Sequence, residues 1–331
     1  MRGKADVEVL LATYNGERYL SEQIDSILAQ DYPNLRVLAR DDSSQDGTPA
    51  VLNEYESRFP GCVRVLRSGQ ATGSAKDNFL QLLRASTGKY VCLSDQDDVW
   101  IPQKVTVTMR CMDQLEASWG AKLPFLVFTD LRVVDENLRT LHDSFWKHEK
   151  VDTGRVHRFG ALLGQNVVTG CTALLNRNLV ELALRMPSEA YMHDQWVALL
   201  ASGMGKAIAL DAQTVLYRQH QRNVVGSRQR TASLTEFIRR VRNGEARQKQ
   251  WRTSQKQAES FLRIHQAELP AQQRDQLLAF LRCGQTRSNL VRTFLLIRHG
   301  FLPSGILEKL AMLTDQWAIR TTNDFCGHHD D

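Results

Sequence analysis

Residues 89–100 read KYVCLSDQDDVW, and the interpretation of the whole chain depends on this stretch. Its apolar part, residues 90–93, has the length and β-rich composition of a buried strand. Three carboxylates follow it at once: Asp95, Asp97 and Asp98. Like charges that emerge together repel one another unless a cation lies among them, and their oxygens are ligands that Mg²⁺ and Mn²⁺ prefer. The other interpretation is an acidic turn that caps a helix starting near Pro102.

The composition is that of a globular chain long enough for one large domain and a smaller one. Its 331 residues are 42% hydrophobic and 24% charged. The six cysteines are scattered without a CxxC pair, which suits a reducing compartment. The N-terminus lacks the apolar core of a signal peptide, and charged residues interrupt the most apolar window, residues 294–313. The sequence therefore predicts a cytoplasmic protein.

The net charge of +5 is unevenly distributed. Ten arginines and lysines lie between Gly226 and Arg263, where three glutamates oppose them. Such a stretch, together with apolar side chains near the C-terminus, predicts peripheral contact with the cytoplasmic face of a membrane. Two other interpretations remain open for this region. Its helices would pack on the preceding domain or on a second copy, forming a homodimer, or the arginines would hold nucleic acid in a non-catalytic module.

Strands and helices are expected to alternate through the first hundred residues. Apolar runs followed by polar loops predict strands at residues 7–12, 35–39, 63–66 and 90–93, with helices between them. This alternation predicts βαβ units and a mainly parallel α/β sheet flanked by helices. Ligands bind outside the carboxyl ends of such strands. The loops expected to converge there are residues 12–17, 40–46, 68–76 and 94–100.

Later elements are less regular. We expect a helix from Pro102 to about Ser118. Further strands are expected at residues 125–128, 166–175 and 207–215, and further helices around residues 177–185 and 193–201. After Gly226, β-branched runs become rare and helical periodicity dominates. The expected organisation is a domain at residues 1–226 followed by a helical region at residues 227–331.

A series of motifs in this chain resembles the family 2 glycosyltransferases of the GT-A fold. The motifs are LLATYNGERYL (10–20), DDSSQDGT (41–48), SDQDDVW (94–100), TGCTALLN (169–176), MHDQW (192–196) and YRQHQRNVVG (217–226). The last three are similar to bacterial rhamnosyltransferases that build surface polysaccharides such as O-antigen. The resemblance covers about residues 6–226, and it implies the GT-A fold for that region.

The resemblance implies that the first loops bind a nucleotide-sugar donor. The expected donor-side residues are Ala12, Thr13, Tyr14, Glu17, Asp42, Lys76, Asp95 and Arg218. Asp42 would accept the imide N–H of uracil or thymine, and Arg218 would contact the diphosphate. Lys76 lies at a helix start, where an anion is favoured, although a solvated surface lysine is the other interpretation.

The resemblance also makes Asp95-Gln96-Asp97 the DxD motif of a divalent-cation site. Asp97 would ligate Mg²⁺ or Mn²⁺ between the two phosphates, with Asp95 facing the cation or the donor. His220 would be a further protein ligand, although a lone histidine is more often a surface or satisfied residue. Asp98 is expected to be a supporting hydrogen-bond acceptor.

Asp194 is expected to be the general base that takes the proton from the acceptor hydroxyl as it attacks C1. The other interpretation of a carboxylate at a helix start is a cap. His193 and Trp100 are expected on the acceptor side. A single base with no covalent nucleophile implies inversion at the anomeric carbon. The Gln-x-x-Arg-Trp motif of processive relatives is absent from the sequence, so transfer is expected to be non-processive.

Taken together, the resemblance implies transfer of L-rhamnose from dTDP-L-rhamnose to a growing bacterial surface polysaccharide or a lipid-linked glycan. A UDP-hexose or UDP-hexosamine donor is the alternative, because sugars that differ by one methyl or hydroxyl group are distinguished by pocket shape. A nucleotidyltransferase would need a Gly-rich, basic triphosphate loop near the N-terminus. The stretch ATYNGERYL does not supply one.

Overall fold

The computed structural model describes residues 6–67, 70–220 and 244–303, together with 305, 309, 312 and 313. Its first half is the expected run of parallel strands. The strands are β1 (Val7–Thr13), β2 (Leu35–Asp41), β3 (Val63–Val65) and β4 (Tyr90–Ser94). They are connected by α1 (Glu17–Leu28), α2 (Thr48–Arg58) and α3 (Ala75–Ala85). All three pairings in the order β3-β2-β1-β4 are parallel.

The second half of the sheet is more mixed than the sequence predicted. Its strands are β5 (Val99–Trp100), β6 (Phe125–Val134), β7 (Thr140–His142), β8 (Leu174–Asn176) and β9 (Lys206–Arg218). Within the described residues the sheet has nine strands in the order β3-β2-β1-β4-β8-β6-β9-β5, with β7 paired to β6. β6 and β9 are parallel, whereas β8 is antiparallel to both of its neighbours.

The strand expected at residues 166–175 is mostly not a strand. Residues 170–172 form a single 3₁₀ turn, and extended pairing is confined to Leu174–Asn176. Thr172 donates to the carbonyl of Thr169 through both its backbone N–H and its hydroxyl. These local hydrogen bonds compete with a sheet ladder, and they explain why the small-residue run TGCT turns instead of extending.

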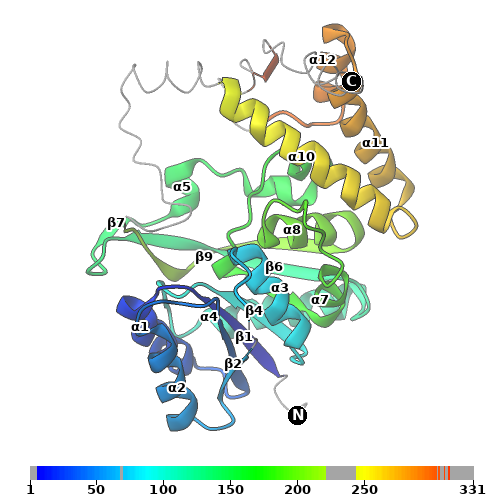
Figure 1. The fold of residues 1–331 in the computed structure, drawn as a ribbon. Coiled ribbons are helices and arrows are strands. Elements are labelled where there is room, and N and C mark those ends of the chain that lie inside the picture. Colours follow the sequence, from blue (N-terminus) through cyan, green and yellow to red (C-terminus); the bar gives the residue numbers. More distant parts are fainter. Residues whose placement is uncertain are drawn as a thin grey trace, which may run out of the picture. The chain divides into compact units, whose positions relative to one another are not determined.

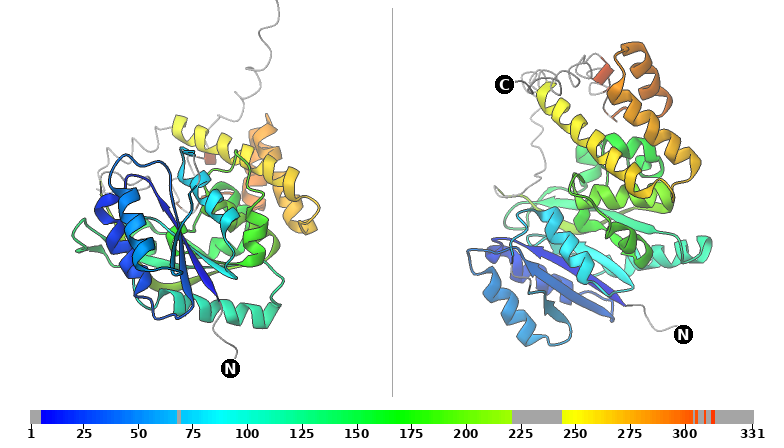
Figure 2. Two further views of the ribbon diagram at one scale, coloured as in Figure 1. Left: turned by 60° about the horizontal axis from the view of Figure 1, so that its bottom comes forward. Right: turned by 45° about the vertical axis from the view of Figure 1, so that its right-hand side comes forward.

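Helices cover both faces of the sheet (Figure 1, Figure 2). The other helices of this part are α4 (Lys104–Trp119), α5 (Phe145–Glu149), α7 (Arg177–Ala183) and α8 (His193–Met204). On one face, Val7, Val9 and Leu11 of β1 share a core with buried residues of α1, α2 and α4. On the other face, α3 packs against β1. β1 is therefore buried on both faces, and all seven of its residues are buried.

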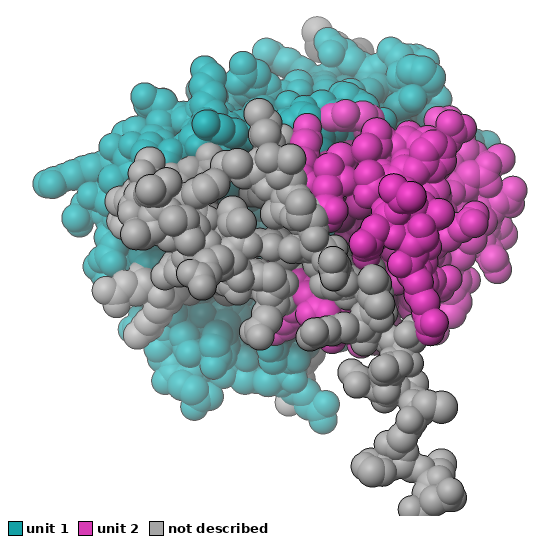
Figure 3. Space-filling model, turned by 90° about the horizontal axis from the view of Figure 1, so that it is seen from above, with its two compact units in different colours: residues 1–157, 167–186, 192–228 teal, residues 158–166, 187–191, 229–331 magenta. Residues whose placement is uncertain are grey.

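The chain divides into two compact units (Figure 3). The first comprises residues 1–157, 167–186 and 192–228, and the second comprises residues 158–166, 187–191 and 229–331. The predicted boundary at residues 226 and 227 lies outside the described residues. The second unit also takes in two short segments that the sequence analysis assigned to the first domain.

Aromatic packing holds the second unit together. Its helices are α6 (Phe159–Gly164), α10 (Gly244–His265), α11 (Ala271–Gln285) and α12 (Asn289–Arg298). Phe159 of α6 packs against Phe261 of α10 with the ring centroids 5.6 Å apart. Phe280 of α11 packs against Trp251 and Phe301. Among the described residues, no helix combines the length and apolar content that crossing a membrane requires.

Candidate active site

The carboxyl ends of β1, β2 and β4 lie side by side, so the loops that follow them emerge at one edge of the sheet. Thr13 at the end of β1 is in register with Asp41 at the end of β2. Leu11 of β1 is in register with Ser94, the last residue of β4. The polar loops predicted to converge therefore start from neighbouring positions.

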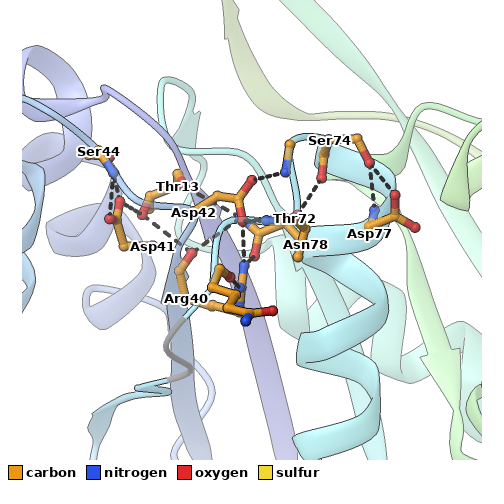
Figure 4. Close-up of polar contacts among 11 residues, drawn as sticks. Thr13, Arg40, Asp41, Asp42, Ser44, Thr72, Ser74, Asp77 and Asn78 are labelled. Carbon is orange, nitrogen blue, oxygen red and sulfur yellow. Dashed lines mark hydrogen bonds and ion pairs between the residues drawn. The ribbon is translucent and has the colours of Figure 1, made fainter.

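Asp42 lies at the centre of a buried hydrogen-bond network (Figure 4). Its Oδ1 accepts from Arg40 Nη1 at 2.8 Å, from Thr72 N at 2.6 Å and from Thr72 Oγ1 at 2.9 Å, and its Oδ2 accepts from Gly73 N at 2.9 Å. Burial alone would raise the pKa of Asp42. The hydrogen bonds from Arg40, Thr72 and Gly73 outweigh burial and hold the pKa below its usual value. The carboxylate is thus kept ionised.

Arg40 is a site residue that the sequence analysis did not identify. Its Nη1 also donates to Asn78 Oδ1 at 2.8 Å, and its Nη2 donates to the carbonyl of Gln70 at 2.8 Å. Asn78 in turn donates to the carbonyls of Thr13 and Arg40 at 3.3 Å each. The sequence feature that could have indicated this role is a charged residue within the apolar strand β2. An arginine is almost never buried without partners.

The loop after β1 is held by the loop after β2. Asp41 accepts from Ser44 N at 2.8 Å, and Ser43 has φ of 68°, which fixes a tight turn. Thr13 Oγ1 donates to Asp41 Oδ1 at 3.1 Å. Glu17 Oε2 accepts from Gly47 N at 2.9 Å, so in this structure Glu17 organises the loop before α2.

Ala12 and Tyr14 differ in exposure. Ala12 is buried at the end of β1, whereas the Tyr14 side chain is 57% exposed. Their contact with a donor stays a prediction. The backbone of Tyr14 is bound on both sides by Gln96, whose Oε1 accepts from Tyr14 N at 2.7 Å and whose Nε2 donates to Tyr14 O at 2.9 Å.

The DxD aspartates and His220 lie close together. His220 Nε2 is 2.9 Å from Asp97 Oδ2, and the His220 ring stacks on Tyr19 with the centroids 5.2 Å apart. Burial raises the pKa of Asp95 to about 7, and the negative charges of Asp97 and Asp194 add to the effect. Asp194 comes from α8, far along the chain, but it adjoins the same place. A Cβ atom on Gly170 would lie 3.4 Å from Asp194 Cβ, and the Sγ of the next residue, Cys171, is within 4.8 Å of an Asp95 carboxylate oxygen.

The ligand atoms that these residues offer fit a divalent cation. Carboxylates of Asp95 and Asp97 and the imidazole of His220 are hard and borderline ligands of the kind that Mg²⁺ and Mn²⁺ accept. Asp98 is fully buried, and among the described residues its Oδ2 has no hydrogen-bond partner. Such an orphaned carboxylate oxygen is costly unless a cation or proton compensates it.

Cys171, in the TGCTALLN motif, is a further neighbour of these carboxylates. One ligand atom each from Asp95, Asp98 and Cys171 lie within 4.8 Å of one another. Burial raises the pKa of the Cys171 thiol well above its usual value, and the charges of Asp98 and Asp95 reinforce the shift. The thiol therefore stays protonated.

The structure gives Arg218 a buried position inside the protein. Its backbone N–H donates to Asp98 Oδ1 at 3.3 Å, and its Nε donates to the carbonyl of Asp97 at 2.9 Å. Its Nη1 donates to the carbonyl of Glu136 at 2.6 Å, and its Nη2 forms an ion pair with Glu22 at 2.5 Å. Arg218 is 2% exposed and braces the DxD loop from β9. The contact with the diphosphate that the resemblance implied for Arg218 stays a prediction, whereas its pairing with Glu22, 196 residues away, has no signal in the sequence.

Asp194 and His193 begin helix α8 but have different surroundings. Asp194 lies in the first helical turn, and its Oδ1 accepts from Gln195 N at 2.6 Å. His193 is 5% exposed and stacks on Phe79 of α3 with the ring centroids 4.0 Å apart. Burial lowers the pKa of His193 to about 3, so its imidazole is neutral at neutral pH. His193 packs α8 onto α3 and thereby helps to fix the helix start that carries Asp194.

Trp100 and Lys76 complete the set of predicted residues. The Trp100 ring is 2% exposed in the core, with Lys104 Nζ 4.4 Å from its centroid. The structure does not bring Trp100 to the surface that an acceptor would reach. Lys76 lies in the first turn of α3, with its Nζ 3.8 Å from Asp77 Oδ1.

Solved structures with the same architecture are glycosyltransferases of the GT-A fold. One is residues 1–349 of TarS from Staphylococcus aureus in complex with UDP-GlcNAc, with a TM-score of 0.52 and 15% identity over 93% of this chain and 90% of that chain. Another is the mannosyltransferase PcManGT from Pyrobaculum calidifontis in complex with GDP-Man and Mn²⁺. Its TM-score is 0.53, with 18% identity over 96% of this chain and 86% of that one. These similarities confirm the predicted fold class.

The sequence comparisons define the family. The family model for glycosyl transferase family 2 matches residues 8–180, more than half of the 331 residues, and the chain therefore belongs to that family. The dTDP-rhamnosyl transferase RfbG of Shigella flexneri is 27% identical over 228 residues, which are 66% of this chain and 74% of that protein. An uncharacterised glycosyltransferase of Rickettsia prowazekii, RP339, is 27% identical over 193 residues, covering 57% of this chain and 56% of that protein.

Proposed function

We propose that this glycosyltransferase is inverting, metal-dependent and non-processive, and that it moves one sugar from a nucleoside diphosphate to a hydroxyl of a growing glycan. The observation that carries the proposal is the grouping of acidic side chains and a histidine beyond the end of β4. His220 Nε2 lies 2.9 Å from Asp97 Oδ2, and Asp194 of α8 adjoins Gly170, whose neighbour Cys171 is within 4.8 Å of an Asp95 oxygen. This grouping supports a cation site and a general base at the same edge of the sheet.

Asp194 is the proposed general base. It takes the proton from the acceptor hydroxyl as that oxygen attacks C1 from the face opposite the leaving diphosphate, which inverts the anomeric carbon. It lies in the first turn of α8, where the helix N-terminus carries partial positive charge. His193 and Phe79 hold the turn in place from the buried side.

The proposed cation ligands are Asp97, Asp95 and His220. Bound Mg²⁺ or Mn²⁺ would supply Lewis-acid stabilisation of the charge that develops on the leaving diphosphate. On the nucleotide side, Asp42 is the proposed acceptor of the imide N–H. Its Oδ2 accepts from Gly73 N, and a carboxylate oxygen has room for a second donor. Lys76, at the start of α3, is the proposed contact to the donor's anionic part.

The proposed donor is dTDP-L-rhamnose, supported by the similarity to the Shigella rhamnosyl transferase. Uracil and thymine present the same imide N–H, so Asp42 does not distinguish UDP-sugars from dTDP-sugars. A UDP-hexose or UDP-hexosamine is therefore the alternative donor. The proposed acceptor is a hydroxyl of a growing bacterial surface polysaccharide or of a lipid-linked glycan.

Nucleoside diphosphate release from a panel of nucleotide sugars tests the proposed function. We expect slow, acceptor-independent hydrolysis of dTDP-L-rhamnose that needs Mg²⁺ or Mn²⁺ and falls to background when EDTA removes the metal. UDP-glucose and UDP-N-acetylglucosamine in the same assay identify the alternative donors. Turnover unaffected by EDTA would rule out the metal role, and no release from any nucleotide sugar, with no binding of any nucleoside diphosphate, would rule out the proposed function.

We also propose that α12 contacts an anionic membrane surface on the cytoplasmic side. Leu290, Phe294 and Ile297 lie on one face of the helix and are 85%, 59% and 59% exposed. Residues 286–303 contain arginines but no Asp or Glu, which suits a basic amphipathic helix at an anionic interface. Most of the basic stretch between Gly226 and Arg263 lies outside the described residues, so the proposal depends on α12.

Vesicle co-sedimentation tests this contact. We expect the protein to bind phosphatidylglycerol vesicles more tightly than phosphatidylcholine vesicles. Replacing Phe294 and Ile297 by serine should weaken binding at least tenfold, because each buried apolar side chain contributes about 1.5–3 kcal/mol. Leu278→Ser on α11, where Leu278 is 48% exposed, is the matched control. Equal vesicle binding by all variants would contradict the proposal. A lower molecular mass in solution for the double variant than for the wild type would instead indicate that these side chains form a homodimer contact.

A further inference from the structure

Gln96 is the middle residue of the DxD motif, and it connects two loops that belong to different ends of the proposed donor site. Both polar atoms of its amide pair with the backbone of Tyr14, at 2.7 Å to the N–H and 2.9 Å to the carbonyl. The two residues are 82 positions apart in the chain. This double hydrogen bond has the pattern of a backbone pair, in which one group donates and the other accepts.

The pairing is specific to a glutamine opposite a glycine. A Cβ atom on Gly16 would lie 2.2 Å from Gln96 Oε1 and 2.4 Å from its Cδ, so any other residue at position 16 would displace the amide. Gly16 has φ of −108°, which other residues adopt freely. The glycine is therefore needed here for the close approach of Gln96 and not for its backbone conformation.

The loop that Gln96 holds is also tied to the nucleotide side. Asn15 N donates to Ser44 Oγ at 2.8 Å, and Gln45 N donates to Asn15 Oδ1 at 2.8 Å. These hydrogen bonds tie the loops after β1 and β2 into one piece. Gln96 joins that piece to the loop that carries Asp95 and Asp97.

We infer that Gln96 is a positioning residue that sets the spacing between the nucleotide side and the cation side of the donor site. The inference rests on the proposed function. A nucleoside diphosphate spans the two sides, with its base near Asp42 and its phosphates near Asp97. If the two sides already have the correct spacing before the ligand binds, no binding free energy is lost in ordering the loops. Gln96 should therefore contribute to binding without touching the ligand.

Binding measurements on two variants that break the clamp by different routes test the inference. Gln96→Leu removes both hydrogen bonds. Gly16→Ala keeps the glutamine at position 96 but displaces its side-chain amide. In each variant we expect Mn²⁺-dependent binding of dTDP and UDP, measured by calorimetry, to weaken about tenfold, as expected for the loss of two ordinary hydrogen bonds. Binding of dTMP and UMP without metal should change less than about twofold, because these ligands do not span both sides.

The matched control is Gln114→Leu, the same substitution away from the site. Gln114 is an exposed residue of α4. This variant should bind all four nucleotides as the wild type does. Combining Gly16→Ala with Gln96→Leu should weaken diphosphate binding no more than Gln96→Leu alone, because the two changes break one interaction.

The outcomes distinguish the positioning role of Gln96 from the proposed function of the protein. Diphosphate binding retained by Gln96→Leu, or mono- and diphosphate binding lost in equal measure, would overturn the positioning role. Equal loss would indicate a general disruption of the loop. A wild-type protein that binds no nucleoside diphosphate with Mn²⁺ or Mg²⁺ would overturn the proposed function, and the positioning role with it.

Discussion

Asp194→Asn is expected to lower the rate constant for sugar transfer by a factor of about 10²–10⁴, the usual contribution of a general base. Asparagine is nearly isosteric, and its carbonyl oxygen can still accept from Gln195 N, as Asp194 Oδ1 does at 2.6 Å. The variant therefore keeps the helix start but has no site that can take the acceptor proton. Binding of the nucleoside diphosphate with Mn²⁺ should stay within about threefold of the wild type, because the base does not hold the donor.

Initial transfer rates to an acceptor, together with calorimetric binding, separate this effect from a loss of structure. Asp113→Asn, on the exposed side of α4, is the control for the same chemical change away from the site, and it should transfer sugar at the wild-type rate. A transfer rate for Asp194→Asn above about one tenth of the wild-type rate would contradict the base assignment. A parallel loss of diphosphate binding would indicate that Asp194 helps to hold the donor or the cation.

The edge of the sheet that carries the site could be predicted because its signals are local. Apolar runs that end in Thr13, Asp41 and Asp95 mark the strands and their carboxyl ends, and parallel pairing brings such ends together. The length of the strand around β8 was overestimated because TGCT contains small and β-branched residues. In the structure this stretch folds back through local hydrogen bonds. Composition does not reveal that competition.

The partners of individual side chains could not be predicted, because they depend on pairings between distant positions. Arg218 reaches Glu22, 196 residues away, and is thereby buried inside the protein. Trp100 follows the acidic motif directly, yet β5 pairs with β9 and its ring enters the core. Gln96 is the middle residue of the DxD motif, to which the resemblance gives no role, and its amide binds the backbone of Tyr14. None of these contacts leaves a periodic signal in the sequence.

Arg40→Met is expected to lower the free energy of unfolding by about 3–5 kcal/mol, the usual cost of removing one partner of a buried ion pair. The side chains of Arg40 and Asp42 are 1% and 6% exposed and lie 2.8 Å apart. Methionine fills much of the same volume but leaves the Asp42 charge uncompensated and Asn78 Oδ1 without its donor. Urea unfolding at pH 7.5 measures the change.

Arg36→Met provides the contrast within the same strand. The ion pair of Arg36 with Asp6 is 43% and 41% exposed, so its loss should cost only about 0–1 kcal/mol. Adding Asp42→Asn to Arg40→Met should recover part of the lost stability, because it removes the uncompensated charge and leaves an amide that Thr72 and Gly73 can still bind. Two arginine variants of equal stability would contradict the structural role of Arg40. If the double variant recovers stability but not nucleotide binding, the Arg40–Asp42 ion pair also prepares Asp42 to bind the uracil or thymine ring. Stability and nucleotide binding would then depend on different properties of the Asp42 carboxylate.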